Sequence, residues 1–120
     1  MSTQFYSGER RGTEVTVVKL GDKAHPLGKA LDPRLDLRSH SPDGFEWGYG
    51  GSGPAQLALA LLADHTQDDE AALRCYRAFK DEVVSKLDEK KWELRPNQID
   101  EFFDQLNASM ELDLGGSTEA

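Results

Sequence analysis

The residues best suited to chemistry lie in a glycine-rich stretch near the middle of the chain, residues 48–54. Gly48, Gly50 and Gly53 match the pattern G-x-G-x-x-G, and the stretch connects a predicted strand to a predicted helix. Such a turn can present bare backbone N–H groups at the positive end of a helix, where phosphates bind. Glycines also let a strand turn sharply into a helix, with Ser52 or Gly53 as the N-cap, and this structural role needs no ligand.

Two nucleotide-binding motifs that contain glycine-rich turns do not fit this stretch. The chain continues into a second helix and a short strand instead of the parallel partner strand of a dinucleotide fold. The turn also lacks the lysine of a P-loop. If the turn binds a ligand, we expect an anion site that combines the turn residues Gly50, Gly51, Ser52 and Gly53 with three basic residues that precede them. These are Arg34, Arg38 and His40. Alternatively, the two arginines are solvated or pair with Asp32 and Asp36.

No pattern in the chain predicts a catalytic constellation. Ser52 is followed two positions later by Pro54, where the nucleophile elbow of a hydrolase has glycine. Cys75 falls on the apolar stripe of a predicted helix, as a small core residue does. Asp64 and His65 are an adjacent acid and base, although a histidine is favourable at a helix C-terminus without any reaction. With one cysteine and three histidines in no zinc-ligand pattern, we expect no metal and no cofactor, and the sequence leans against enzymatic activity without excluding it.

The net charge of −8 is carried entirely by the second part of the chain. Residues 1–53 hold seven basic and seven acidic side chains, whereas residues 54–120 hold seven basic and fifteen acidic ones. This balance argues against direct binding to nucleic acid or an anionic membrane and favours a basic protein partner, although acidity also serves solubility. The N-terminus lacks the apolar core of a signal peptide, and no apolar run is long enough to span a bilayer, so we expect a cytoplasmic protein.

The first part of the chain favours strands and turns. Residues 4–7 and 13–20 are rich in aromatic and β-branched side chains, and they predict an N-terminal β-hairpin with residues 8–12 as its loop. The proline-rich segment that follows is predicted to be irregular, with a short extended stretch at residues 35–37. Residues 45–49 alternate aromatic with small or polar side chains and predict a third strand whose aromatic face lies on the core.

The second part of the chain is helical in its apolar spacing. Pro54 opens a predicted helix that is apolar on nearly all sides and is therefore buried; residues 64–68 interrupt it. The next helix starts near Asp68 or Asp69 and carries one buried stripe: Ala72, Tyr76, Phe79, Val83 and Leu87.

Residues 92–94 then predict a short strand, and Pro96 opens a last helix with an inward face: Ile99, Phe102, Phe103 and Leu106. The sequence thus predicts a small single α+β domain over residues 1–107. Residues 108–120 are predicted to be a flexible acidic tail, because their composition offers little to pack.

The stretch FEWGYGGSGPAQLALALL, residues 45–62, resembles a family of small uncharacterised proteins from bacteria, archaea and their phages and plasmids. Residues 33–42, the helical pattern from Tyr76 to Leu87, and Trp92 also resemble this family, so the resemblance extends over about residues 5–105. It implies an intact domain of unknown function with no established catalytic residues to carry over. A phage or plasmid context, implied by the same resemblance, suits a modulator of host machinery.

Two functions of different classes remain open from the sequence. The first is a non-enzymatic, acidic protein-interaction domain that binds a basic partner through residues 54–120, in the manner of a mobile-element modulator of a host protein. The second is a domain that binds a small molecule, a phosphate or a nucleotide at the glycine-rich turn, either as a binding module or as an enzyme. Neither predicts an oligomeric state.

Overall fold

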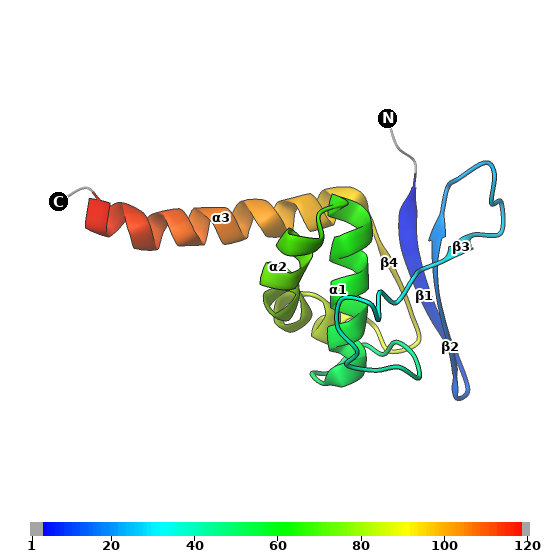
Figure 1. The fold of residues 1–120 in the computed structure, drawn as a ribbon. Coiled ribbons are helices and arrows are strands. Elements are labelled where there is room, and N and C mark those ends of the chain that lie inside the picture. The colour runs from blue at the N-terminus through cyan, green and yellow to red at the C-terminus, as the bar shows by residue number, and fades with distance from the viewer. Residues whose placement is uncertain (1–3, 119–120) are drawn as a thin grey trace.

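One antiparallel sheet and the helices beside it make up the fold (Figure 1). The computed structural model describes the backbone of residues 4–118 and the side chains of residues 4–109. The strands are β1 (Phe5–Arg11), β2 (Glu14–Leu20), β3 (Lys29–Ala30) and β4 (Lys91–Leu94), in the sheet order β3-β2-β1-β4. The helices are α1 (Ser52–Thr66), α2 (Asp69–Glu82) and α3 (Pro96–Thr118), with a 3-10 turn, η1, at Val84–Lys86. The predicted α+β class is confirmed.

The N-terminal hairpin is longer and its turn is tighter than predicted. Strand β1 extends through residues 8–11, which were expected to be a loop, and only Gly12 and Thr13 connect it to β2. Gly12 has a φ of +63°, which a two-residue hairpin turn requires. Gly8 lies inside the strand because the indole of Trp92 covers it, and a Cβ at Gly8 would stand only 2.3 Å from that ring. The prediction failed because this glycine serves packing rather than a turn.

Residues 45–49 are not a strand, and residues 35–37 form a turn instead of an extended stretch. The aromatic alternation around Trp47 is real, but only Trp47 is fully buried, while Tyr49 is 52% exposed. The indole Nε1 of Trp47 donates a hydrogen bond to the backbone oxygen of Glu89, and its ring meets that of Trp92 edge-on at 5.6 Å. The segment therefore packs against the loop before β4 rather than joining the sheet.

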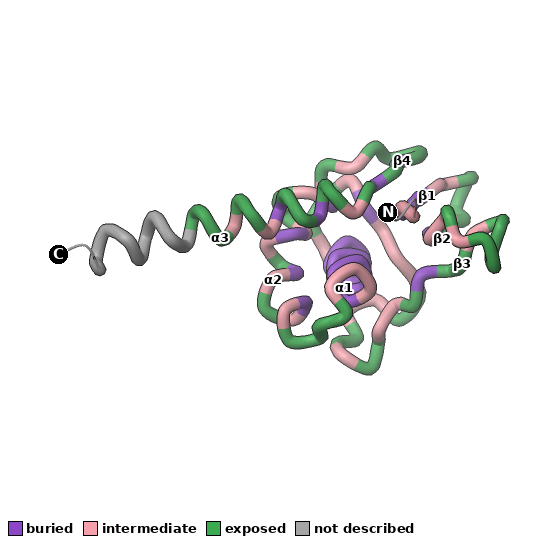
Figure 2. Tube along the Cα trace, turned by 90° about the horizontal axis from the view of Figure 1, so that it is seen from above, coloured by how far each residue is buried: buried purple, intermediate pink, exposed green. Residues whose placement is uncertain are grey.

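Helix α1 is the centre of the molecule, as the sequence predicts. Figure 2 shows it buried along most of its length, with the sheet on one side and α2 and α3 on the other. The helix begins at Ser52, two residues before Pro54, and Gly51 is the N-cap without a side-chain hydrogen bond. It continues through Thr66, inside the predicted interruption, and Gln67 ends it in the left-handed conformation with a φ of +55°.

Helix α2 begins at Asp69, and the carboxylate of Asp68 caps it by accepting a hydrogen bond from the N–H of Ala71. It ends at Glu82, and the stripe members within it are buried as predicted, whereas Val83 and Leu87, which lie beyond the helix, are half-buried. In η1 the side chain of Val84 is fully buried instead. The predicted strand at residues 92–94 is confirmed as β4. Helix α3 begins at Pro96 as predicted, and Ile99 and Phe102 face the core.

Helix α3 runs on through Thr118, beyond the predicted domain boundary at residue 107, and Figure 1 shows it projecting past the rest of the molecule. The flexibility of residues 108–120 stays a prediction, and most of their side chains lie outside the described residues. Within residues 4–118, no helix has both the length and the apolar character needed to cross a bilayer.

Candidate functional site

The glycine-rich turn, residues 48–53, has structural requirements at only some of its glycines. Gly48 has a φ of +84°, which a residue with a Cβ rarely adopts. A Cβ on Gly53 would lie 2.6 Å from the Cβ of Glu46, whose carboxylate forms an ion pair with Arg10. A Cβ on Gly50 would meet open space, and the backbone there is not left-handed. Packing therefore requires glycine at position 53, whereas neither packing nor the backbone conformation requires it at position 50.

One of the three predicted basic residues, His40, lies at this turn. The Nε2 of His40 and the hydroxyl of Tyr76 are hydrogen-bonded at 2.7 Å. A cavity of about 300 Å³ adjoins them at the start of α1, and three of the residues in its wall are basic. Its lining is His40, Gly51, Ser52, Ala55, Tyr76, Arg77 and Lys80. Sequence analysis missed Arg77 and Lys80, although their spacing of three positions on a helix places them on one side of α2.

The predicted arginines lie elsewhere. Arg34 forms ion pairs at 3.0 Å with both Asp36 and Asp69, at the other end of α1 from the glycine-rich turn. These hydrogen bonds raise the pKa of the Arg34 guanidinium and lower the pKa of the Asp36 carboxyl. The exposed guanidinium of Arg38 donates to the backbone oxygen of Leu37. The structure therefore does not bring Arg34 together with the glycine-rich turn, and its pairing with Asp36 matches the alternative interpretation.

Gln56 organises the loop that carries these residues, and sequence analysis missed it. Its side chain is fully buried on α1 and forms four hydrogen bonds. The amide oxygen accepts from the N–H groups of His40 and Ser41 at 2.7 and 3.1 Å. The amide nitrogen donates to the oxygens of Pro33 and Arg38 at 2.6 and 3.0 Å. The available signal was a single glutamine inside an otherwise apolar helical run.

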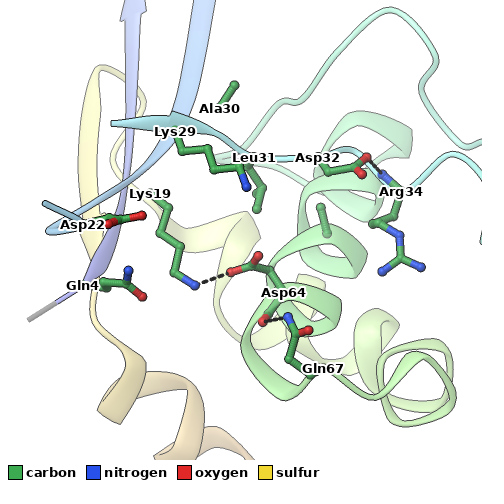
Figure 3. A pocket seen from close by; sticks show the side chains of 11 residues that line it. Gln4, Lys19, Asp22, Lys29, Ala30, Leu31, Asp32, Arg34, Asp64 and Gln67 are labelled. Carbon is green, nitrogen blue, oxygen red and sulfur yellow. Dashed lines mark hydrogen bonds and ion pairs between the residues drawn. The ribbon is translucent and has the colours of Figure 1, made fainter. Parts of the chain in front are cut away.

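A second cavity lies at the far end of α1, between that helix and strands β2 and β3 (Figure 3). We call it the polar cavity; its volume is about 370 Å³, and its lining is Gln4, Lys19, Asp22, Lys29, Ala30, Leu31, Asp32, Arg34, Ala60, Asp64 and Gln67. Its lining holds three basic and three acidic side chains, and the predicted site residue Arg34 is one of them. It therefore differs from the cavity at the glycine-rich turn, whose titratable lining includes no carboxylate.

Two side chains hold the carboxylate of Asp64 in the polar cavity. Its Oδ2 accepts hydrogen bonds from the hydroxyl of Tyr6 at 2.6 Å and from the ammonium of Lys19 at 2.8 Å. Burial by itself would raise the pKa of Asp64, but the hydrogen bonds from Lys19 and Tyr6 outweigh it and the pKa is lowered. Burial and the nearby Asp64 carboxylate raise the pKa of Tyr6. The neighbouring His65 instead bonds to Asp100 at 2.7 Å, so Asp64 and His65 have separate partners.

A third feature is a groove of about 500 Å³ between α2 and α3, which we call the α2–α3 groove. Its lining is Ala78, Glu82, Val83, Leu94, Gln98, Glu101, Phe102, Gln105, Leu106 and Ser109. Half of these side chains are apolar, and the charged ones are both glutamates, which are exposed. The groove thus combines an apolar floor with an acidic rim, and it lies in the part of the chain that carries the whole net charge.

These features define a small α+β domain with an acidic helical layer, a polar cavity at each end of α1, and an acidic, partly apolar groove between α2 and α3. The chain belongs to DUF6166, a family of unknown function, whose family model matches residues 6–105. No curated protein and no solved structure matches the chain. The expected membership in a family of unknown function is thereby confirmed over nearly the range expected from the sequence.

Proposed function

We propose that this domain is a non-enzymatic protein-interaction module that binds a basic, amphipathic helix of a partner protein in the α2–α3 groove. The observation that carries the proposal is the combination of an apolar floor with an acidic rim. Val83, Phe102 and Leu106 offer apolar contact, and amphipathic helices bind such grooves through one apolar face. Glu82 and Glu101 stand where the basic face of such a helix would lie.

The charge distribution supports a basic partner in particular. All of the net charge of −8 resides in residues 54–120, which include α2 and α3. A field of one sign speeds the encounter with an oppositely charged partner and disfavours acidic competitors. The same field disfavours nucleic acid, whose phosphates would be repelled. A role as a phage- or plasmid-borne modulator of a host protein in the cytoplasm is the finer form of this proposal, and it rests on the resemblance of residues 45–62.

A displayed peptide library tests the partner's chemistry directly. We expect selection on the wild-type protein to enrich peptides rich in lysine and arginine, with apolar residues three or four positions apart. A double variant, Glu82→Gln with Glu101→Gln, should weaken their binding roughly fivefold to tenfold, and added salt should weaken binding to the wild type further.

The matched control is a double variant with the same change of net charge away from the groove, Glu14→Gln with Glu70→Gln. Both control residues are exposed, lie outside the groove and form no ion pair with a described residue, so the domain should keep its affinity for the peptides. Enriched peptides that bind the groove variant and the control variant equally well would show that the groove is not the docking site. Enrichment of acidic or wholly polar peptides would also contradict the proposal.

Binding of an anion at the glycine-rich turn is the second candidate function. The cluster of His40, Arg77 and Lys80 beside that turn favours it. Titration with inorganic phosphate should shift the amide signals of residues 48–53 and of Ala55. Arg77→Ala should weaken that binding roughly tenfold, the factor that corresponds to one charge-assisted hydrogen bond, whereas Arg74→Ala on the same helix should not. Equal affinities for the two variants, or unchanged amide signals, would leave the turn with a structural role.

A further inference from the structure

Neither function above uses the polar cavity. It lies between β2 and β3 on one side and the last turns of α1 on the other (Figure 3). We propose that it binds a small zwitterion of the amino-acid class, a molecule that carries one carboxylate and one ammonium group. The proposal stands independently of the interaction function, because the polar cavity and the α2–α3 groove share no lining residue.

The charges around the polar cavity select for a zwitterion. The three basic and three acidic side chains are Lys19, Lys29, Arg34, Asp22, Asp32 and Asp64. An inorganic anion such as phosphate would meet three carboxylates, and a simple cation would meet three basic groups, so each would be opposed by half of the charged lining. A zwitterion can place each of its charges beside side chains of the opposite sign.

Lys29 is the group that we expect to hold the carboxylate. The guanidinium of Arg34 is engaged by two carboxylates, and the ammonium of Lys19 is engaged by Asp64. Among the described residues, the ammonium of Lys29 forms no ion pair, and Figure 3 shows its side chain reaching from β3 toward α1. The charge of Lys29 helps to lower the pKa of Asp22 and of Asp64, but neither carboxylate forms an ion pair with it. A bound carboxylate would give the ammonium a direct partner.

Asp64 is the group that we expect to face the ammonium. A carboxylate offers about four lone-pair positions, and Tyr6 and Lys19 both bond to Oδ2. Asp64 therefore keeps acceptor capacity while those two partners fix its orientation. Gln67 lies beside it, with Nε2 donating to the backbone oxygen of Asp64 at 2.7 Å. Because α1 and the sheet both hold these groups, the acceptors are in place before any ligand arrives.

The size and polarity of the cavity agree with this class of ligand. Its volume of about 370 Å³ lies at the small end of the range for ligand pockets, roughly 300 to 1,000 Å³. Leu31 and Ala60 are among its few apolar lining residues, so a large hydrophobic molecule would find little surface to bury. A free amino acid or a dipeptide fits both limits.

Amide NMR of the wild-type protein tests the proposal with defined probes. Each of the common L-amino acids is added in turn to about 10 mM, a concentration that detects millimolar affinities, and inorganic phosphate and methylammonium serve as probes with a single charge. We expect at least one amino acid to shift the signals of residues 29–32 and 64–67, and neither single-charge probe to do so. No response to any amino acid, or an equal response to phosphate, would overturn the proposal.

A matched pair of lysine variants locates the site. Lys29→Met should weaken binding of the responding amino acid roughly tenfold, because it removes the cation that faces the carboxylate. Lys23→Met removes the same charge from an exposed turn outside the polar cavity and should leave the affinity unchanged. Neither lysine forms an ion pair with a described residue, so both variants should fold. Unchanged affinity in Lys29→Met would show that the zwitterion binds elsewhere.

Discussion

Replacing Gln56 by leucine should release the loop of residues 33–41 from α1 without disturbing the helix itself. Leucine has nearly the volume of glutamine and suits a buried helix position, so the change removes the hydrogen bonds and little else. Four backbone groups would lose their partner, namely the N–H groups of His40 and Ser41 and the oxygens of Pro33 and Arg38.

The expected loss of stability follows from these four bonds. At about 1 kcal/mol each, their combined net contribution is about 4 kcal/mol. The leucine side chain recovers about 1 kcal/mol by burying apolar surface, and water can reach part of the half-exposed loop. We therefore expect the free energy of unfolding to fall by about 2 to 3 kcal/mol, a large fraction of the stability of a small domain.

Urea unfolding followed by circular dichroism measures this loss, and amide hydrogen exchange at residues 40 and 41 shows where it occurs. Exchange at both amides should become faster, since their acceptor is gone. Gln105→Leu, at an exposed position of α3 beside the α2–α3 groove, is the control and should change stability by less than about 0.5 kcal/mol. An unchanged midpoint for Gln56→Leu, with unchanged exchange at His40, would refute the view that this amide holds the loop.

Two further outcomes are expected. Gly53→Ala should lower the free energy of unfolding by about 1 to 3 kcal/mol, because the new Cβ would collide with Glu46. Gly50→Ala, whose Cβ meets open space, should be neutral or slightly stabilising in the same urea experiment. Equal effects of the two variants would contradict the conclusion that packing requires glycine at position 53 but not at position 50. Because the pKa of Asp64 is lowered in the folded state, its contribution is present at neutral pH and is lost as pH falls through that pKa, below about pH 4. The stability difference between the wild type and Asp64→Asn should therefore shrink between pH 7 and about pH 3, and a constant difference would show that Lys19 and Tyr6 do not hold an ionised carboxylate.

The sequence predicts the central helix and the last helix well because their signals are local. Pro54 followed by an apolar run specifies a buried helix, and Pro96 followed by inward aromatic residues specifies the start of α3. The segment around Trp47 was wrongly predicted to be a strand, because an apolar alternation with a period of two also fits an extended chain outside any sheet. Whether such a chain joins a sheet depends on a neighbouring edge, which the local sequence does not contain.

The candidate sites were harder to predict because they depend on contacts between distant segments. Arg34 was expected at the glycine-rich turn, but Asp69, thirty-five residues later, binds it at the opposite end of α1. Lys19 and Asp64 meet across forty-five residues, and each alone is an ordinary surface residue type. The α2–α3 groove likewise needs the packing of two helices before its apolar floor and acidic rim are adjacent. By contrast, Gln56 had a local signal, since a lone amide in an apolar helix must find partners.

The edge-on contact between Trp47 and Trp92 gives the fold an intrinsic optical reporter. These are the chain's only tryptophans, so its indole fluorescence and most of its near-ultraviolet absorption come from one pair of rings, 5.6 Å apart and inclined by 83°. Two indole rings this close influence each other's near-ultraviolet transitions, and that influence depends on the rings staying together. One ring belongs to the segment before α1 and the other to β4. Near-ultraviolet dichroism can therefore report the docking of these two segments in the unlabelled protein, separately from the far-ultraviolet signal of the helices.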